Sequence, residues 1–279
     1  MILELGADHR YDITHRALVM GILNRTPDSF FDGGRYYDFD GFLAKAEALV
    51  LDGADFLDVG GVKAGPGPEV GTDEELERVV PAIAALRERF EVPISVDTWN
   101  PVVLRAALEA GADIGNDISG FAHPDYLPTC AELGASVVAT HIRLGPRIPD
   151  PEPVYDDVVV DVRRFLAARA AAALDAGIPA ERIMVDDGLD LGKTEPQSLE
   201  LLRTSDQLAS LGYAAFLSAS NKRFLGELLH LEVGERREAS HAAHVLGITL
   251  GCRVLRAHDV AGARRTADLV AELLERRDG

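Results

Sequence analysis

Short apolar runs alternate with longer amphipathic stretches along nearly the whole chain, and this alternation constrains the fold more than any other feature. Eight runs have the composition of strands buried on both faces, as in a parallel sheet: 17–23, 55–60, 93–98, 114–119, 135–141, 183–188, 214–220 and 253–259. A helix-like stretch follows each run: 40–52, 73–90, 101–110, 124–133, 156–176, 196–211, 222–230 with 238–250, and 262–276. Eight successive β/α units predict a closed (β/α)8 barrel, that is, a TIM barrel of the α/β class.

The main structural alternative is an open, doubly wound sheet. Such sheets favour a glycine-rich phosphate turn after the first strand, but residues 24–29 here read NRTPDS, which is polar and contains no GxGxxG pattern. Gly53 and Gly111 each precede a strand within a Gly-Ala-Asp triplet, as helix C-caps do. No linker or composition break divides the 279 residues. We therefore predict a single domain, 1–279, with the barrel core at about 17–275.

Composition narrows the possible partners and the compartment. The chain has 46 acidic and 28 basic residues and a formal net charge of −18, the opposite sign from that of a nucleic-acid binder. No apolar run reaches the roughly 18 residues that span a membrane, and residues 1–10 lack the apolar core of a signal peptide. The two cysteines, Cys130 and Cys252, form no CxxC pair and are interpreted as buried free thiols. We expect a cytoplasmic protein with no nucleic-acid or membrane partner.

Nearly every predicted strand ends in polar residues. A single aspartate at such a position is usually a helix cap or a turn residue. Eight polar strand ends together, on the face where barrel enzymes do their chemistry, indicate a functional site. The residues are Asn24, Asp58, Asp97-Thr98, Asn116-Asp117, His141, Asp186-Asp187, Ser220-Asn221-Lys222 and Arg256-Ala257-His258-Asp259.

The residue types suggest a flat heteroaromatic ligand. Asp97, Asn116 and Asp186 offer carboxylates and a carboxamide that can pair with the donors and acceptors of an amino-heterocycle. Lys222 can meet a ring carbonyl or ring nitrogen.

Three further residues suit a phosphorylated substrate. Arg256 and His258 form a basic pair on one strand that fits phosphate or pyrophosphate. Asn24 can hold Mg²⁺ through its side-chain oxygen, together with phosphate oxygens. The histidines and cysteines show no zinc-binding spacing.

Several segments, in sequence order, resemble the motifs of the dihydropteroate synthase family. They are MGILNRTPDSFFDGG at 20–34, DVGG at 58–61, ISVDT at 94–98, NDISG at 116–120, GKT at 192–194, SNK at 220–222 and RAHDV at 256–260. The first segment is highly specific, and the resemblance extends from about residue 17 to residue 275.

The resemblance implies a TIM barrel, a cytoplasmic role in folate synthesis and a homodimer formed through the later helices. The family condenses 6-hydroxymethyl-7,8-dihydropterin pyrophosphate with p-aminobenzoate and releases pyrophosphate, in a dissociative reaction without a covalent enzyme intermediate. By matching position, the residues fall into three groups: Asp97, Asn116, Asp186 and Lys222 for the pterin; Asn24, Arg256 and His258 for Mg²⁺ and pyrophosphate; Phe30, Pro66 and Ser220 for p-aminobenzoate. The resemblance thus makes Asn24, Lys222, Arg256 and His258 the catalytic residues.

The departures from the family pattern lie mainly on the amine side and in the catalytic loops. The second loop, usually GGESTRPG, reads GGVKAGPG, so Ala64 and Gly65 replace Thr and Arg, with Lys63 as a neighbouring cation. Six further departures are Arg25 for Val, Ile142 for a Met, Asn221 for the Arg of SRK, and in the DPGIGFGK motif two added acids (Asp187, Asp190) and Leu191 for Phe.

Three functions are compatible with this pattern. The first is a dihydropteroate synthase, which the intact pterin and pyrophosphate residues favour. The second is a divergent paralogue that binds pterin but has lost synthase activity or uses a different amine, which Ala64 and Gly65 favour. The third is a pterin-binding methyltransferase domain that serves a corrinoid protein, but such a domain would not need the TPDSF segment of the first loop.

Overall fold

The computed structural model describes residues 1–25, 39–65 and 67–278 and contains a closed barrel of eight parallel strands. Going round the barrel, the order is β10-β3-β4-β5-β6-β7-β8-β9. The strands are β3 (Leu18–Asn24), β4 (Phe56–Gly60), β5 (Ile94–Asp97), β6 (Ile114–Asp117), β7 (Ser136–Thr140), β8 (Ile183–Asp186), β9 (Ala214–Leu217) and β10 (Val254–Ala257). The prediction of a (β/α)8 barrel is confirmed.

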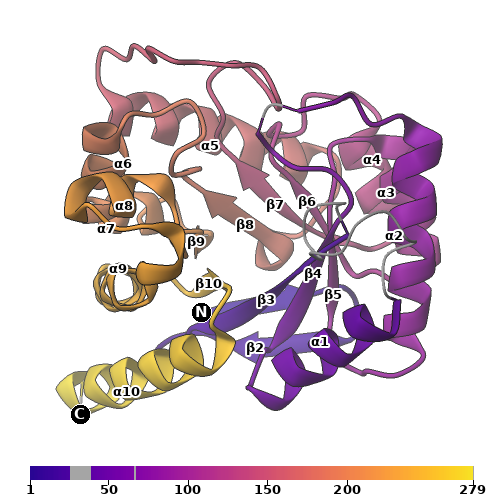
Figure 1. Ribbon diagram of the computed structural model, residues 1–279, viewed down its shortest axis with the longest axis horizontal. Coiled ribbons are helices and arrows are strands. Elements are labelled where there is room, and N and C mark those ends of the chain that lie inside the picture. The colour runs from indigo at the N-terminus through magenta and orange to yellow at the C-terminus, as the bar shows by residue number, and fades with distance from the viewer. Residues whose placement is uncertain (26–38, 66, 279) are drawn as a thin grey trace.

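Helices cover the outside of the barrel. Figure 1 shows α2, α3 and α4 on the right of the strands, α6 to α9 on the left, and α10 running to the C-terminus at the lower left. Their bounds are α1 (Phe39–Leu51), α2 (Thr72–Arg87), α3 (Pro101–Glu109), α4 (Tyr126–Glu132), α5 (Val158–Asp175), α6 (Glu195–Arg203), α7 (Ser205–Ala209), α8 (Arg223–Leu229), α9 (Arg237–Thr249) and α10 (Val260–Asp278), with 3-10 turns at η1 (Ala180–Arg182) and η2 (Val233–Glu235).

Local sequence signals explain where these helices begin and end. Thr194 and Gln197 form a capping box at the start of α6. Gly53 and Gly111 have φ angles of 94° and 110°, which makes them the predicted C-cap residues. The single helix predicted over 196–211 is instead two helices. The break falls at Thr204, whose hydroxyl donates to the Glu200 carbonyl and competes with continuation of the helix.

The core has two parts. One lies between the strands and the surrounding helices, and the other fills the inside of the barrel. An antiparallel hairpin of β1 (Ile2–Leu5) and β2 (His9–Asp12), which the sequence analysis did not predict, belongs to the second part. Leu3, Leu5 and Ile13 are buried there against residues such as Met20 and Phe56. The hairpin therefore closes the amino-terminal end of the barrel, and the carboxyl end remains for the site.

Two sequence-based expectations concern other features of the chain. Cys130 and Cys252 are both free and buried, as predicted. None of the helices within the described residues is long and apolar enough to cross a membrane.

Candidate active site

The parallel barrel brings the predicted polar residues to one end of the molecule. Asn24, Asp97 and Asp186 are the last residues of their strands, and Asn116 and Arg256 lie one residue from the ends of theirs. Ser220, Lys222 and His258 follow β9 and β10 at the same end. Phe30 and Pro66, predicted to border the amine, lie outside the described residues.

A buried charge network joins four strands. Asp58, from β4, is fully buried and accepts from Nε of Arg256 at 2.9 Å. Nη2 of Arg256 also donates to Oδ2 of Asp97 at 3.3 Å, and Nδ2 of Asn116 donates to Oδ1 of Asp58 at 3.3 Å. One guanidinium therefore serves two carboxylates and fixes them relative to Asn116. Buried carboxylates without such a partner would protonate.

Asp97 is the titratable member of this network. Burial raises its pKa to about 7, and the Asp58 carboxylate adds to that shift, while Arg256 opposes it. Asn24 lies near Asp97, with Gly60 between them. A Cβ added at Gly60 would lie 3.6 Å from Oδ2 of Asp97 and 3.7 Å from Oδ1 of Asn24.

A second group of charges lies at the ends of β8 and β9. Oδ1 of Asp186 accepts from the Gly188 amide at 2.7 Å, which fixes the carboxylate. Nζ of Lys222 donates to the Leu189 carbonyl at 2.9 Å. Burial lowers the pKa of Lys222, and Asp190 and Asp186 counteract this effect. Asp186 and Lys222 lie close enough for their opposite charges to interact.

His141 and Lys193 form a buried contact beside this second group of charges. Both are buried, and Nζ of Lys193 lies 2.9 Å from Nδ1 of His141. The same Nζ donates to the Gly188 carbonyl at 2.9 Å. Burial first, and then the Lys193 charge, lowers the pKa of His141 to about 3, so its ring is neutral and Nδ1 can accept a hydrogen bond from Lys193. This contact ties the loop after β7 to the loop after β8.

Ser220 sets the orientation of His258. Oγ of Ser220 accepts from the His258 backbone amide at 3.1 Å and lies 3.0 Å from the ring Nδ1. Because that oxygen already accepts one hydrogen bond, its own proton can be donated to Nδ1. In a neutral His258 ring, Nε2 then carries the hydrogen and is available to an anion.

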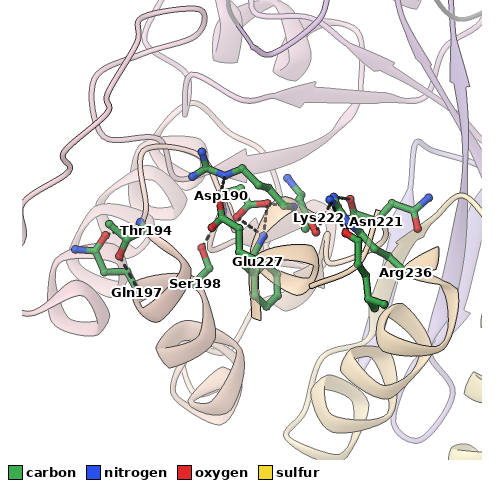
Figure 2. A network of polar contacts seen from close by, with 11 residues as sticks. Asp190, Thr194, Gln197, Ser198, Asn221, Lys222, Glu227 and Arg236 are labelled. Carbon is green, nitrogen blue, oxygen red and sulfur yellow. Dashed lines mark hydrogen bonds and ion pairs between the residues drawn. The ribbon is translucent and has the colours of Figure 1, made fainter. Parts of the chain in front are cut away.

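The loop after β8 is fastened to the start of α8. The backbone of Asp190 has a φ of 68°, and its carboxylate accepts from the amides of Arg223 at 2.5 Å and Phe224 at 3.2 Å. Figure 2 shows Ser198 beside Asp190, with Asn221 beside Arg236. Arg236 donates to the Asn221 carbonyl at 3.1 Å. The acid at position 190 thus caps α8 and holds the segment that carries Lys222.

Asp187, the other added acid, is buried with Oδ1 lacking a hydrogen-bond partner among the described residues. Burial first, and then the Asp186 charge, raises its pKa to about 7.

Sequence reasoning gave no role to three members of this site, although Asp58 and His141 were noted among the polar strand ends. Asp58 was visible only as a polar strand end, and its pairing with Arg256 joins residues 198 positions apart. Lys193 and His141 are likewise 52 positions apart. No sequence spacing encodes either contact. Lys63, the neighbouring cation in loop two, has an exposed side chain.

Comparison with known proteins agrees with this geometry. Residues 20–258 match the family described as pterin binding enzyme. The inactive dihydropteroate synthase 2 of Mycobacterium leprae is 42% identical over 92% of this chain and 91% of its own length. The dihydropteroate synthase of Bacillus subtilis is 39% identical over 94% of this chain and 90% of its own length.

Solved structures agree as well. Yersinia pestis dihydropteroate synthase in a sulfonamide drug complex superposes with a TM-score of 0.92 and 33% identity, covering 99% of this chain and 100% of that one. Xanthomonas albilineans dihydropteroate synthase in complex with 7,8-dihydropteroate gives a TM-score of 0.87 and 37% identity, covering 98% and 99%. Fold and site together define a pterin-binding (β/α)8 transferase. Within that class, the chain belongs to the dihydropteroate synthase family.

Proposed function

We propose that this protein condenses 6-hydroxymethyl-7,8-dihydropterin pyrophosphate with an aryl amine, p-aminobenzoate in the simplest case, and releases pyrophosphate and dihydropteroate. One observation carries the proposal. The Arg256 guanidinium holds Asp58 and Asp97 together, with Asn116 bonded to Asp58, at the end of the barrel that also carries Asp186 and Lys222. The family pattern and this cluster of buried polar groups point to the same ligand.

The pterin is the ligand that matches these polar groups. Its amino group and ring N–H groups are donors, which the carboxylates of Asp186 and Asp97 can accept. Its ring carbonyl and ring nitrogens are acceptors, which Lys222 and the Asn116 amide can serve. A desolvated site strengthens each of these bonds.

The pyrophosphate end would lie towards Asn24, Arg256 and His258. The Asn24 carboxamide is half-buried and has no hydrogen-bond partner among the described residues, so its oxygen fits a hard cation. Asn24 would hold Mg²⁺ together with the pyrophosphate oxygens, and the ion would offset their charge. Within the described ranges, no three His, Cys, Asp or Glu side chains cluster as a metal site. Pyrophosphate oxygens would complete the coordination in the proposed site.

The reaction we propose is dissociative. The bond between the pterin methylene carbon and the pyrophosphate oxygen breaks, and the electron pair leaves with pyrophosphate. Arg256 and the Nε2–H of His258 stabilise the charge that develops on it. The amine nitrogen then donates its lone pair to the methylene carbon and loses a proton. Phe30, Pro66 and Ser220 are proposed to border the amine, as the family pattern implies.

A second candidate function has its own support. Ala64 and Gly65 lack the hydroxyl and the cation of the family's second loop, and the Mycobacterium leprae relative is described as inactive. In this alternative the protein binds pterin but has lost synthase activity, or it uses another amine.

A turnover assay separates the two candidates. Purified protein is incubated with the pterin pyrophosphate, p-aminobenzoate and Mg²⁺, and dihydropteroate and pyrophosphate are quantified. We expect both products in equal amounts. Pterin binding without product would reject the synthase and support the alternative.

The pocket assignment has a separate test. Asp186→Ala is expected to weaken pterin binding at least about 100-fold, because ring donors lose a buried charged acceptor. Asp175→Ala, at an exposed helix end, serves as the control. Isothermal calorimetry gives both affinities, and an unchanged affinity in Asp186→Ala would show that the pterin binds elsewhere.

We also propose that the protein is a cytoplasmic homodimer formed through its later helices. Two buried free thiols suit a reducing compartment. On α9 and α10, Val245, Leu246, Leu269 and Leu273 are 39% to 63% exposed, which supports an association surface there.

A further inference from the structure

Lys193, the lysine of the GKT segment, takes no part in the proposed reaction, yet it is almost completely buried. Only 2% of its surface is exposed. Its Nζ lies 2.9 Å from Nδ1 of His141 and donates to the carbonyls of Gly188 at 2.9 Å, Leu191 at 3.1 Å and His141 at 3.3 Å. An ammonium group has three hydrogens, and these four acceptors occupy them. Lys193 can therefore act on a ligand only through its neighbours.

These contacts hold the turn at 188–191, which follows β8. Lys193 draws the Gly188 and Leu191 carbonyls towards one nitrogen, and the Leu191 amide donates to the Gly188 carbonyl at 3.0 Å. Gly188 has a φ of 65°, and a Cβ there would overlap the His141 carbonyl oxygen. Glycine is therefore required at position 188, and Lys193 bonds the two backbone segments where they approach each other.

The turn provides a hydrogen bond to each of two residues that are proposed to bind the pterin. The Gly188 amide donates to Oδ1 of Asp186 at 2.7 Å. The Leu189 carbonyl accepts from Nζ of Lys222 at 2.9 Å. Loosening of this turn would therefore displace both Asp186 and Lys222.

The charge of Lys193 acts on Asp186 as well. Burial raises the pKa of Asp186, and the main opposing influences are the backbone hydrogen bond from Gly188 and then the charges of Lys222 and Lys193. Burial lowers the pKa of Lys193, while the Asp187 and Asp186 carboxylates oppose that shift. Lys193 and Asp186 therefore each favour the ionised form of the other, and desolvation strengthens the effect.

Other titratable groups surround the pair of Lys193 and Asp186. His141 is neutral, because burial lowers its pKa to about 3, and Cys252 is a thiol, because burial raises its pKa to about 12. Asp187 is the competing acid, and burial first, then the Asp186 charge, raises its pKa to about 7. The remaining groups are Asp190, Lys222 and Arg256.

The other two cations of this set have partners elsewhere in the site. Lys222 is proposed to contact the pterin, and Arg256 is bonded to Asp58 and Asp97. We propose that Lys193 is a positioning residue for pterin recognition, which compensates the Asp186 carboxylate and fixes the turn that holds Lys222. The inference rests on the proposed function and assigns a role to the lysine of the GKT segment without contact with the ligand.

Calorimetric titration with 6-hydroxymethyl-7,8-dihydropterin at pH 7.5 and pH 8.5 tests this inference. Lys193→Gln keeps hydrogen-bond donors at this position but removes the charge. It is expected to bind the pterin about 10- to 100-fold more weakly than the wild type at pH 7.5, because Asp186 then takes up a proton and becomes a poorer acceptor. At pH 8.5 the affinity should recover at least about threefold as Asp186 ionises, whereas the wild type should change by less than about twofold.

Two further variants complete the comparison. Lys193→Arg returns the charge and should restore the weak pH dependence of the wild type, even where its larger side chain lowers the affinity. Arg164→Gln removes an exposed positive charge on α5, which is paired with Asp161, and should bind the pterin as the wild type does at both pH values. Urea unfolding shows whether each variant is folded under the titration conditions.

An unchanged affinity in Lys193→Gln, or a loss of the same size at both pH values, would overturn the inference, because the first shows no role and the second only a structural one. A direct measurement on the wild type decides the question if Lys193→Gln does not fold. The ¹³C NMR signal of the Asp186 carboxyl, assigned with Asp186→Asn, is expected to show an ionised group at pH 7, and a protonated group would overturn the inference. Absence of pterin binding by the wild type would instead reject the proposed function.

Discussion

At the scale of single residues, two carboxylates of the site, Asp58 and Asp97, share one cation, Arg256. Asp58 is fully buried and the Asp97 side chain is 17% exposed, yet both depend on Arg256. One guanidinium cannot fully compensate two desolvated carboxylates. Burial, with the Asp58 charge as the second cause, accordingly raises the pKa of Asp97 to about 7.

Ligand binding should therefore be linked to a proton. Below pH 7 Asp97 is increasingly protonated, but it must be ionised to accept from a ring N–H. Pterin affinity is expected to rise from pH 6 to pH 7.5, with proton release on binding. Calorimetry at pH 6.5 in two buffers of different ionisation enthalpy measures that release. Asp97→Asn should bind more weakly and release no proton, whereas a flat pH profile in the wild type would contradict this linkage.

His244 provides a second titration, outside the barrel. It is 1% exposed, and neither ring nitrogen has a hydrogen-bond partner among the described residues. Burial, with His241 as the second cause, lowers the pKa of His244 from 6.5 to about 4. Between pH 6.5 and pH 4, His244 is protonated in the unfolded chain but neutral in the folded protein. The free energy of unfolding therefore falls as the pH is lowered from 6.5 towards 4.

His244→Leu should remove this pH dependence. At pH 5 the wild type is expected to lose roughly 2 kcal/mol relative to pH 7.5 on account of this residue. The leucine variant should lack that loss and be at least as stable at pH 7.5, because no unpaired polar group remains. Urea unfolding at both pH values measures the difference. His123→Gln, at a half-exposed histidine, is the control; identical pH profiles of wild type and His244→Leu would disprove the assignment.

At the scale of elements, the loop after β8 combines a strained backbone position with a cap. Asp190 has a φ of 68° at a position where the family motif has glycine. Aspartate tolerates this region better than most residues, and its carboxylate supplies two hydrogen bonds to the start of α8. Asp190 thus lacks the conformational freedom of the family's glycine, but its carboxylate forms hydrogen bonds to the start of α8, the helix that follows Lys222.

Two substitutions at Asp190 separate these effects. Asp190→Ala loses the cap and keeps the positive φ, so we expect a cost of about 2 kcal/mol in the free energy of unfolding. Asp190→Gly loses only the cap and should cost about half as much. Urea denaturation provides the comparison, and an alanine variant as stable as the glycine variant would rule out backbone strain at this position.

The amino-terminal hairpin is the element that closes the barrel opposite the site. Leu5 is fully buried inside the barrel with Leu3 and Ile13. Gly6 donates to Ser136 Oγ at 2.9 Å, and Arg182 lies 3.1 Å from Glu4, so the hairpin is also bonded to the barrel rim.

Leu5→Ala is expected to lower the free energy of unfolding by about 2–5 kcal/mol, because it leaves a cavity in a closed core. Pterin affinity should stay within about twofold, since the site lies at the other end. Leu174→Ala, on the outer face of α5 and 42% exposed, should change stability by less than about 0.5 kcal/mol. Equal effects of the two substitutions would mean that the hairpin does not contribute to the core.

At the scale of the whole molecule, exposed apolar side chains support the location of the proposed dimer interface. Leu269 and Leu273 are 63% and 60% exposed and lie one turn apart on α10. α9, which packs against α10, exposes Val245 and Leu246. Figure 1 shows α9 and α10 side by side at one edge of the molecule. Two such surfaces can cover each other in a symmetric dimer.

Leu269→Glu combined with Leu273→Glu should convert the proposed dimer into a monomer, because four carboxylates would be buried in a symmetric interface. Sedimentation equilibrium at micromolar concentration measures the mass. Val102→Glu introduces a charge at another exposed apolar position, 57% exposed on α3, and should leave the dimer intact. A monomeric wild type, or a dimeric double variant, would refute the proposed interface.

Sequence by itself determined the eight β/α units and the polar residue at each strand end. These features are local: buried strands are apolar runs, helix ends carry capping residues, and the carboxyl ends of parallel strands must share one face. The positions of Asn24, Asp97, Asn116 and Asp186 in the fold follow from that alone. The hairpin of β1 and β2 escaped prediction because its four-residue strands carry charges and only alternate residues of β1 are buried.

Only the tertiary structure decided which of these residues interact. Three contacts join residues that no sequence spacing relates. They are the pairing of Arg256 with Asp58, the contact of Lys193 with His141, and the hydrogen bond from the Arg147 amide to the Ala64 carbonyl. Five of the departures lie in three loops that are far apart in the sequence, but they line one cavity in the fold. The physical reason is that hydrogen bonds and charges act over a few ångströms in space, and closure of the barrel sets those distances.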